Sequence, residues 1–458
     1  MRRFATLAFT MLLMGTMGPM AATARPATGS VEQLITSARP FLISTDPGTT
    51  ITPILSSGEV IDGTEGAFQF SGVPDGIGAY ASAPDRLEVF VNHETAYEWG
   101  DPSDARVSHL TLDPNMQVVD ATYLVDGTEG YQYFCSSTLD FVGETPWYFT
   151  GEEWIGAPKS GISIAVNAVT GHVIETPQFG SLNHENVVPI KGLARSMVYL
   201  SEDSFRLESQ AYAYYSDTLW KAIKGEGVFT VWVPDDPGDG NPSANDIAKG
   251  DTLAGRFVSI PNASGYSGLE LNKVSEELGA FDFVRIEDAA HDPGNPGVIY
   301  VSDTGAGKAE TKNGRVYRLT ADPAHPRQAT LEVVLDGDAG DDLVNPDNLG
   351  INETTLVIQE DRNNTKSGYA RVHAYDLGSG TLTAVARLDP SQPAIDASGP
   401  GVWESSGVVD VSGFFGDGYW LLDVQAHKTS VLQQGPTLEL NSARGQRGQL
   451  LLVHIDGT

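Results

Sequence analysis

One short phrase returns along this chain: three or four apolar residues followed by one or two acidic residues. The acids that end these phrases are Glu94, Glu152-Glu153, Glu202-Asp203, Asp303, Glu360-Asp361 and Asp423. Each phrase is typical of a short buried strand that presents a carboxylate at its end. Hard cations prefer carboxylate oxygens as ligands, so carboxylates that converge from several strands would form a cation site.

The spacing of these phrases indicates how the strands are arranged. Successive acids are roughly 50 to 65 residues apart, with one gap near double that, and such a period is typical of a repeat architecture. The chain has 50 glycines and 26 prolines, which favours a turn-rich all-β protein. We predict an all-β, six-bladed β-propeller with loop insertions, in a single domain. The long gap between Asp203 and Asp303 is expected to hold an insertion, with an exposed loop at 235–242.

Helical patterns are sparse. Short helices are expected at 31–37 and 271–278. Elsewhere β-rich runs alternate with Gly, Pro, Asp and Asn, and strands are predicted at 161–166, 228–233, 315–319, 331–335, 371–375 and 450–455.

The overall charge restricts the class of partner. Among 458 residues, 60 are Asp or Glu and 28 are Lys or Arg, which gives a net charge of -32. This acidic excess excludes nucleic acid or an anionic membrane as the main partner. Most of these carboxylates are expected to serve solubility, so only the acids beside apolar strands are assigned a functional role.

The N-terminus is predicted to be a targeting segment. Arg2 and Arg3 form a basic start, an apolar stretch reaches Met20, and 22–24 read Ala-Thr-Ala, an A-x-A cleavage site. We therefore expect a signal peptide at 1–24, cleaved near Ala24, and a propeller domain at 25–458. The protein should be exported to the periplasm or secreted.

The single cysteine, Cys135, is informative because an exported protein meets an oxidising compartment. An intramolecular disulfide needs two cysteines, so Cys135 is either a buried inert thiol or a ligand. The residues themselves leave these two alternatives open.

Several short clusters that contain Cys135 or the acids follow one another along the chain. They are Cys135, Thr145-Pro146-Trp147, Glu152-Glu153, the run from Phe179 to Glu185, Ser201-Glu202-Asp203, the run from Arg285 to Asp288, Pro346-Asp347-Asn348-Leu349 and Trp403-Glu404. Together they resemble the PhoX-type alkaline phosphatase family of secreted bacterial β-propellers. The resemblance runs from about Pro74 to Asp423. A longer spacer between Cys135 and Trp147, and Ile286 in place of a proline, mark a divergent relative.

The resemblance implies a propeller whose axial pocket holds Fe³⁺ and Ca²⁺ and cleaves phosphate monoesters. Cys135, Glu185 and Glu287 would be iron ligands, and Arg285 would contact the phosphate. Either acid of the pairs Glu152-Glu153 and Glu202-Asp203 could ligate a metal, together with Asp347 and Glu404. Without the resemblance, Arg285 could equally form an ion pair with Glu287 or Asp288.

The predicted function is therefore that of a metal-dependent phosphatase, with a small phosphorylated substrate and a monomeric state. Metal cations would clamp the phosphoryl oxygens and activate water. Two alternatives stay open: a calcium-dependent lactonase or esterase that does not need Cys135, and a non-catalytic, calcium-stabilised binding propeller.

Overall fold

The structure is a computed structural model that describes residues 36–96, 104–204, 208–236, 242–309, 311–362, 368–392, 401–427 and 447–458. All of the described residues belong to one compact unit, Gln33–Thr458. The predicted signal peptide, most of the expected helix at 31–37 and most of the loop at 235–242 lie outside the described residues. No helix in the described ranges has both the length and the hydropathy of a membrane span.

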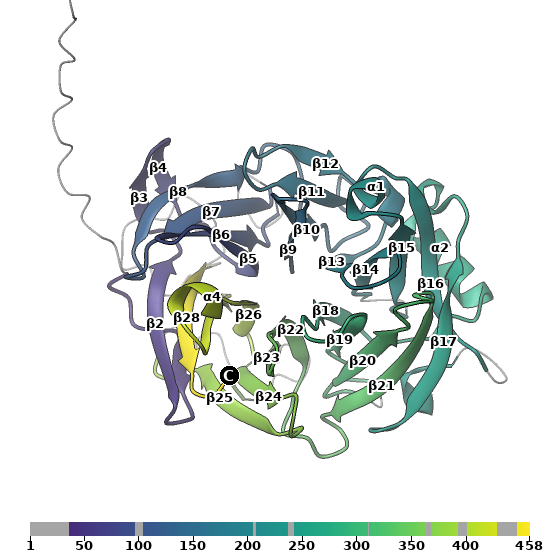
Figure 1. The fold of residues 1–458 in the computed structure, drawn as a ribbon. Helices are drawn as coiled ribbons and strands as arrows, with labels where there is room; N and C mark the ends of the chain where they lie inside the picture. Colours follow the sequence, from purple (N-terminus) through teal and green to yellow (C-terminus); the bar gives the residue numbers. More distant parts are fainter. Residues whose placement is uncertain are drawn as a thin grey trace, which may run out of the picture. The chain divides into compact units, whose positions relative to one another are not determined.

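The unit Gln33–Thr458 is built from antiparallel sheets arranged around a common centre, as Figure 1 shows. Two of these sheets have four strands each in simple sequence order. Their strands are β5 (Pro74–Ala83), β6 (Arg86–His93), β7 (Arg106–Leu112) and β8 (Val118–Val125), then β9 (Thr138–Val142), β10 (Thr145–Gly151), β11 (Ser163–Asn167) and β12 (Val173–Glu175).

The next sheet has nine strands and contains two four-stranded meanders with one further strand between them. The first meander is β13 (His184–Ile190), β14 (Ser196–Glu202), β15 (Tyr212–Ser216) and β16 (Gly227–Pro234). The second is β18 (Ile286–His291), β19 (Val298–Asp303), β20 (Arg315–Ala321) and β21 (Gln328–Asp336). Strand β17 (Thr252–Ser259) pairs with β16 on one side and β21 on the other. It lies within the insertion predicted between Asp203 and Asp303.

The last two large sheets include strands from the N-terminal part of the chain. One contains β22 (Pro346–Ile351), β23 (Thr355–Glu360), β24 (Arg371–Asp376) and β25 (Leu382–Leu388), with β1 (Leu42–Ser44) on its edge. The other contains β26 (Glu404–Asp410), β27 (Tyr419–Ala426) and β28 (Arg447–Ile455), with β2 (Thr49–Ser56) on its edge. A separate hairpin is formed by β3 (Val60–Gly63) and β4 (Gly66–Gln69).

The predicted all-β, propeller-like fold is confirmed. Among the described residues the large sheets are four of four or five strands and one of nine, so six separate blades are not observed. The phrases that end in an acid are the second strands of their groups, β6, β10, β14, β19, β23 and β27. These strands are almost completely buried because neighbouring sheets cover both of their faces.

The predicted strands and the helix expected at 271–278 are also observed. The strands predicted from sequence correspond to β11, β16, β20, β21, β24 and β28. The helix expected at 271–278 is α2 (Gly268–Glu277), which begins with a capping box between Ser267 and Glu270. Two shorter helices are α1 (Leu219–Ile223) and α4 (Ser412–Phe415), and short 3₁₀ turns lie at Pro177–Phe179, Ala244–Asp246 and Ala263–Gly265.

The first strand of each group faces the common centre. Strands β5, β9, β13, β18, β22 and β26 contact one another in this order, and β26 contacts β5, so they form a closed ring. Apolar clusters pack outside this ring, between the faces of adjacent sheets. The sheets are therefore fixed to one another by apolar burial, and the polar starts of the ring strands are left to form a site.

Candidate metal centre

Five of the six ring strands share one local arrangement at their starts. In β5, β13, β18 and β22 the first residue of the strand pairs with the last residue of the second strand, and Phe134, four residues before β9, pairs with the residue that follows β10. The pairs are Pro74–His93, Phe134–Glu152, His184–Glu202, Ile286–Asp303 and Pro346–Glu360. Side chains alternate along a strand, so the residue after each paired one points to the opposite face. In β5, β13, β18 and β22 a β-bulge follows at once and re-aims the side chains beside it.

The loops that lead into three of these starts share a further feature. Val73, Tyr133 and Asn345 have positive φ angles of 42°, 54° and 52°. Each lies two residues before Asp75, Cys135 or Asp347, respectively. Because left-handed backbone is uncommon for residues other than glycine, its recurrence shows that the same turn is built three times.

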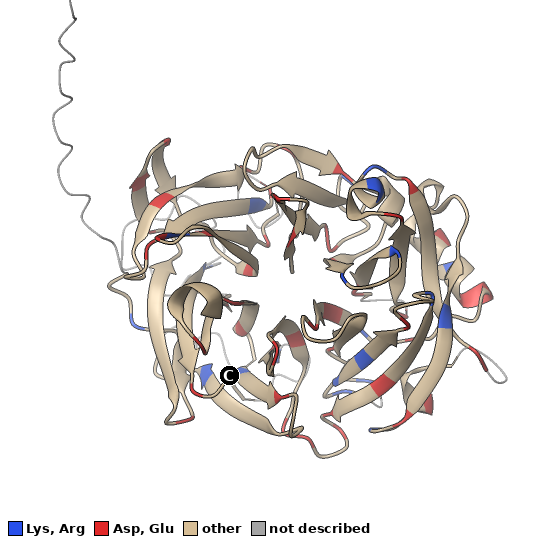
Figure 2. Cartoon of the chain, in the orientation of Figure 1, with Lys and Arg blue, Asp and Glu red and all other residues tan. Residues whose placement is uncertain are grey.

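Nine residues that each follow a paired one, together with Glu404 at the start of β26, form five linked groups, within which the potential ligand atoms lie within 4.8 Å of one another. Acidic positions accordingly gather at strand ends near the common centre (Figure 2). The groups are Asp75–Glu94–Cys135, Cys135–Glu153–Glu185, Glu153–Asp203–Glu287, Glu185–Glu287–Asp347 and Asp347–Asp361–Glu404. We call these ten residues the carboxylate ring. They supply nine carboxyl groups and one sulfur, a donor set that fits hard cations together with one thiolate-binding metal.

Burial of these acids has a strong electrostatic consequence. Burial and the charge of Asp75 raise the pKa of Glu94 to about 8, and burial raises the pKa of Asp75 to about 6. Burial and neighbouring carboxylates raise the pKa values of Glu153, Glu185, Glu287, Asp347 and Glu404 well above the usual range. So many acids cannot all be ionised at neutral pH without compensating positive charge. Cations bound among them would supply that charge.

Cys135 lies within the carboxylate ring. Its thiol donates a hydrogen bond of 2.8 Å to Oε2 of Glu153, and the residue is 4% exposed. Burial, and then the charges of Glu153 and Glu94, raise the pKa of the thiol well above its usual value. The surroundings of Cys135 are therefore acidic and not merely apolar, which favours a ligand over an inert thiol.

Arg285 lies beside the carboxylate ring and is held by two acids. Its Nε donates to Oδ1 of Asp203 at 2.9 Å, and its Nη2 donates to Oδ2 of the same carboxylate. Nη2 also lies 3.0 Å from Oε1 of Glu287. The ion pair with Glu287 that the sequence allowed is present, and the bidentate pair with Asp203 accompanies it.

The structure distinguishes the two members of each acid pair. Glu153 and Asp203 belong to the carboxylate ring, whereas Glu152 and Glu202 occupy the paired positions and lie outside its groups. Glu152 instead accepts hydrogen bonds from the backbone N–H groups of Gln132 at 3.0 Å and Gly161 at 3.1 Å. It thereby fixes the loop that leads to Cys135.

The same anchoring contact recurs in two other sheets. Asp303 accepts from the backbone N–H of Val284 at 3.0 Å, and Glu360 accepts from that of Val344 at 2.9 Å. Gln132, Val284 and Val344 each lie three residues before a member of the carboxylate ring. Glu152 and Glu360, each the first acid of a pair, therefore hold loops in place, and Glu153 and Asp361 after them enter the ring. Asp303 holds a loop in the same way, although Thr304 follows it and no acid. Glu202 departs from this pattern, because its Oε2 is buried with no hydrogen-bond partner in the described part of the chain.

The predicted site residues Cys135, Glu153, Glu185, Asp203, Glu287, Asp347 and Glu404 are brought together. Sequence reasoning left Asp75, Glu94 and Asp361 out of the site. Glu94 and Asp361 end two of the apolar phrases, and Pro74-Asp75-Gly76 resembles Pro346-Asp347-Asn348. Comparing the starts of the ring strands, instead of the ends of the second strands alone, would have identified Asp75.

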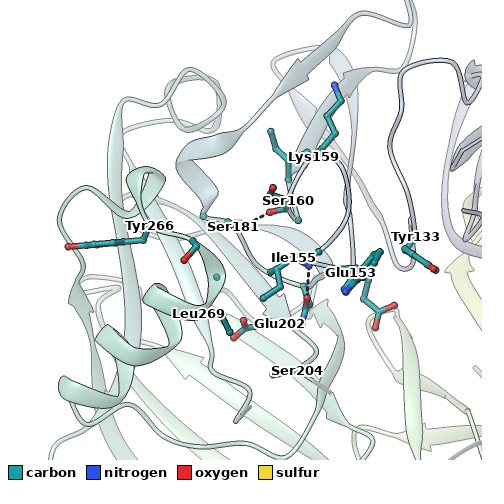
Figure 3. A pocket seen from close by; sticks show the side chains of 18 of the residues that line it. Tyr133, Glu153, Ile155, Lys159, Ser160, Ser181, Glu202, Ser204, Tyr266 and Leu269 are labelled. Atoms are coloured by element: carbon teal, nitrogen blue, oxygen red, sulfur yellow. Dashed lines mark hydrogen bonds between the residues drawn. The ribbon is translucent and has the colours of Figure 1, made fainter. Parts of the chain in front are cut away.

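A pocket of about 1080 Å³ opens beside the carboxylate ring. Glu94 and Glu153 of the ring line it, together with Tyr133 and Trp154. Figure 3 shows Tyr133 and Glu153 on one side of this space and Tyr266 and Leu269 on the other. The pocket therefore gives a small molecule a route to the ring.

Comparisons by sequence find no relative: no family model matches the chain, and neither does any curated protein. Among solved structures, Pseudomonas fluorescens PhoX in complex with vanadate, a transition state analogue, is similar to this chain with a TM-score of 0.64. The match is 12% identical and covers 93% of this chain and 97% of PhoX. At this identity the likeness shows that the two proteins share a fold.

Other propellers are more distant. The soluble aldose sugar dehydrogenase of Escherichia coli has a TM-score of 0.40 at 8% identity, covering 89% of this chain and 99% of the dehydrogenase. Trypanosoma rangeli sialidase in complex with sialic acid has a TM-score of 0.39 at 8% identity, covering 90% of this chain and 59% of the sialidase. Likenesses this weak carry no argument about chemistry.

Proposed function

We propose that this protein is a metal-dependent phosphatase that hydrolyses phosphate monoesters at its carboxylate ring. The observation that carries the proposal is the convergence of nine carboxyl groups and the Cys135 sulfur beside Arg285. We further propose that Fe³⁺ and Ca²⁺ are the resident ions. Carboxylates suit both ions, and a thiolate ligand suits iron better than calcium.

The shared fold supports this proposal from a separate direction. PhoX holds vanadate, described as a transition state analogue, and its chain matches this one over nearly its whole length. We count the two meanders of the nine-stranded sheet as two blades joined by β17, which gives a six-bladed propeller with one innermost strand per blade. We also propose that the protein is an exported monomer.

Individual residues of the chain would have separate roles in this reaction. The bidentate contact with Asp203 fixes the plane of the Arg285 guanidinium, whose donors match the geometry of a phosphoryl group. The anchoring acids Glu152, Asp303 and Glu360 hold the loops that carry the ligands, which keeps the ring preorganised. Bound cations would neutralise the charge on the phosphoryl oxygens and lower the pKa of water.

The position of Cys135 distinguishes this function from a lactonase on the same fold. Cys135 belongs to two of the five groups and connects them, whereas calcium alone would be served by the carboxylates. Retained turnover of an ester or lactone by a Cys135→Ala variant would favour the lactonase. A protein that loses thermal stability on calcium removal but never shows turnover would be the non-catalytic propeller.

The direct test is metal analysis of purified, untagged protein together with phosphate release from a model monoester. We expect bound iron and calcium, phosphate release, and inhibition by vanadate. Protein without bound iron that stays inactive after loading with iron and calcium would refute the proposal.

A further inference from the structure

The pocket beside the carboxylate ring is lined by large apolar and aromatic side chains, which a phosphate group alone would not require. Trp154, Tyr133, Tyr266 and Leu269 line it. Trp154 is 41% exposed and Leu269 is 61% exposed, although both are large apolar side chains. Exposed apolar groups that gather in one concave site favour a bound apolar molecule.

The position of Trp154 links this wall to the reacting centre. It directly follows Glu153 of the carboxylate ring, and its ring lies 5.8 Å from that of Tyr133 at an interplanar angle of 87°. The indole also covers Gly156, where a Cβ atom would meet its Cε2 at 2.6 Å. If a phosphate ester binds at the carboxylate ring, its organic group would therefore contact Trp154 and Tyr133.

The charged residues of the pocket also restrict which organic group it can bind. Three acids line it, Glu94, Glu153 and Glu202. Lys159 also lines it, but its Nζ lies 2.8 Å from Oε1 of Glu175 and 4.7 Å from the centre of the Tyr131 ring. Because this positive charge is already paired, the pocket offers an additional anionic group little compensation.

We propose that this pocket binds the alcohol half of the substrate and selects aromatic alcohols that carry no negative charge. The inference rests on the proposed phosphatase function. Hydrolysis breaks the bond between phosphorus and the aryl oxygen, and the oxygen of water forms the new bond to phosphorus. One proton of that water passes through solvent to the leaving oxygen or to the phosphate product. The released alcohol is uncharged and apolar, as the pocket requires.

The test compares 2-naphthyl phosphate with glycerol 3-phosphate on the metal-loaded full chain. We expect wild type to favour 2-naphthyl phosphate in kcat/KM, and Trp154→Ala to reduce that preference by about tenfold or more, chiefly through KM. Leu269→Asn, on a different element, should reduce it in the same direction. Trp220 is equally 41% exposed and does not line the pocket, so Trp220→Ala should leave the preference unchanged.

Binding of 2-naphthol, measured by calorimetry, tests the pocket assignment independently of the proposed phosphatase function. Binding that weakens in Trp154→Ala, in a protein without turnover, would refute the phosphatase function and support the pocket assignment. Phosphatase activity with equal kcat/KM for both substrates, unaffected by Trp154→Ala and Leu269→Asn, would overturn the pocket assignment alone. Absence of both turnover and 2-naphthol binding would overturn both.

Discussion

Asp203 holds the guanidinium of Arg285 through both of its carboxylate oxygens, although the two residues are 82 positions apart. Asp203 follows β14 and Arg285 precedes β18, so the contact joins the two meanders of the nine-stranded sheet at the common centre. The same guanidinium also approaches Glu287. An arginine fixed in this way keeps its planar donors oriented before any substrate arrives.

Replacing this arginine by lysine should therefore reduce turnover even though the charge is kept. We expect Arg285→Lys to lower kcat by about 10²-fold or more, because an ammonium cannot reproduce the paired donors. Arg318 is the matched control, since its Nη2 pairs with Glu332 and neither residue belongs to the carboxylate ring or anchors it. Arg318→Lys should leave kcat near that of wild type. Equal activity of the wild type and Arg285→Lys would show that Arg285 is structural.

The adjacent acids Glu152 and Glu153 should respond differently to the same substitution. Glu153→Gln removes a charged donor from two groups of the carboxylate ring, so bound metal should fall and activity should decrease by about 100-fold. Glu152→Gln weakens the hydrogen bonds to Gln132 and Gly161, which should cost about 1–3 kcal/mol in the free energy of unfolding while metal content is retained. Metal analysis and urea unfolding of both variants make the comparison. The reverse result would mean that the first acid of the pair is the ligand.

Cys135 should control the metal content of the protein. We expect Cys135→Ala to lose iron, with calcium retained in the groups that do not include Cys135. Cys135→Ser keeps the shape and a hydrogen bond to Glu153 but removes the thiolate, so it should also lose iron. Ser137→Ala is a nearby control, because its hydroxyl is buried and Ser137 belongs to none of the groups of the carboxylate ring. Iron bound equally by Cys135→Ala and wild type would exclude the sulfur as a ligand.

The carboxylate ring should reverse the pH dependence of stability when metal is removed. In metal-free protein the pKa values of Asp75, about 6, and Glu94, about 8, exceed those of the unfolded chain, near 4. The folded state then binds more protons, so its stability should rise as the pH falls from 8 to 5. Metal-loaded protein should instead become less stable as the pH falls from 8 to 5, because protons compete with the cations for the carboxylates.

Thermal melting at pH 5 and pH 8, with and without a chelator, measures this difference. The same direction of change in both samples would argue against cations in the ring.

Gly76 should be sensitive to the addition of a single methyl group. Its N–H donates to the carbonyl of Cys135 at 3.0 Å, and a Cβ atom there would meet the backbone N of Ser137 at 2.4 Å. Gly76→Ala should displace the loop that carries Cys135, lower stability by about 1–3 kcal/mol and reduce iron binding. Gly265→Ala, where a Cβ atom meets nothing within 4 Å, should change neither quantity. Unchanged iron content in Gly76→Ala would show that the loop tolerates the shift.

The fold class and most of the site could be predicted because both follow from short-range patterns. Strands such as β23 and β27 appear in the sequence as apolar runs because neighbouring sheets cover both faces. The acids at their ends therefore stand out. The nine-stranded sheet could not be foreseen, since the pairing of β17 with β21 joins residues more than 70 positions apart and has no local signal.

The choice between paired acids was also beyond the sequence. Whether Glu152 or Glu153 enters the ring depends on the register of the Phe134–Glu152 bridge, and a shift of one residue would exchange their roles. Asp75 was overlooked for a different reason. It begins a strand with no apolar run before it, so its position becomes clear only beside Pro346-Asp347.

Strand β2 pairs with β28, and β5 contacts β26, so elements from opposite ends of the described chain close the circle. During synthesis, Asp75 emerges from the ribosome long before Glu404, and the last partner of β2 emerges later still. The circle therefore cannot close around the complete set of donors until β28 has been synthesised, which would delay stable metal capture until that point.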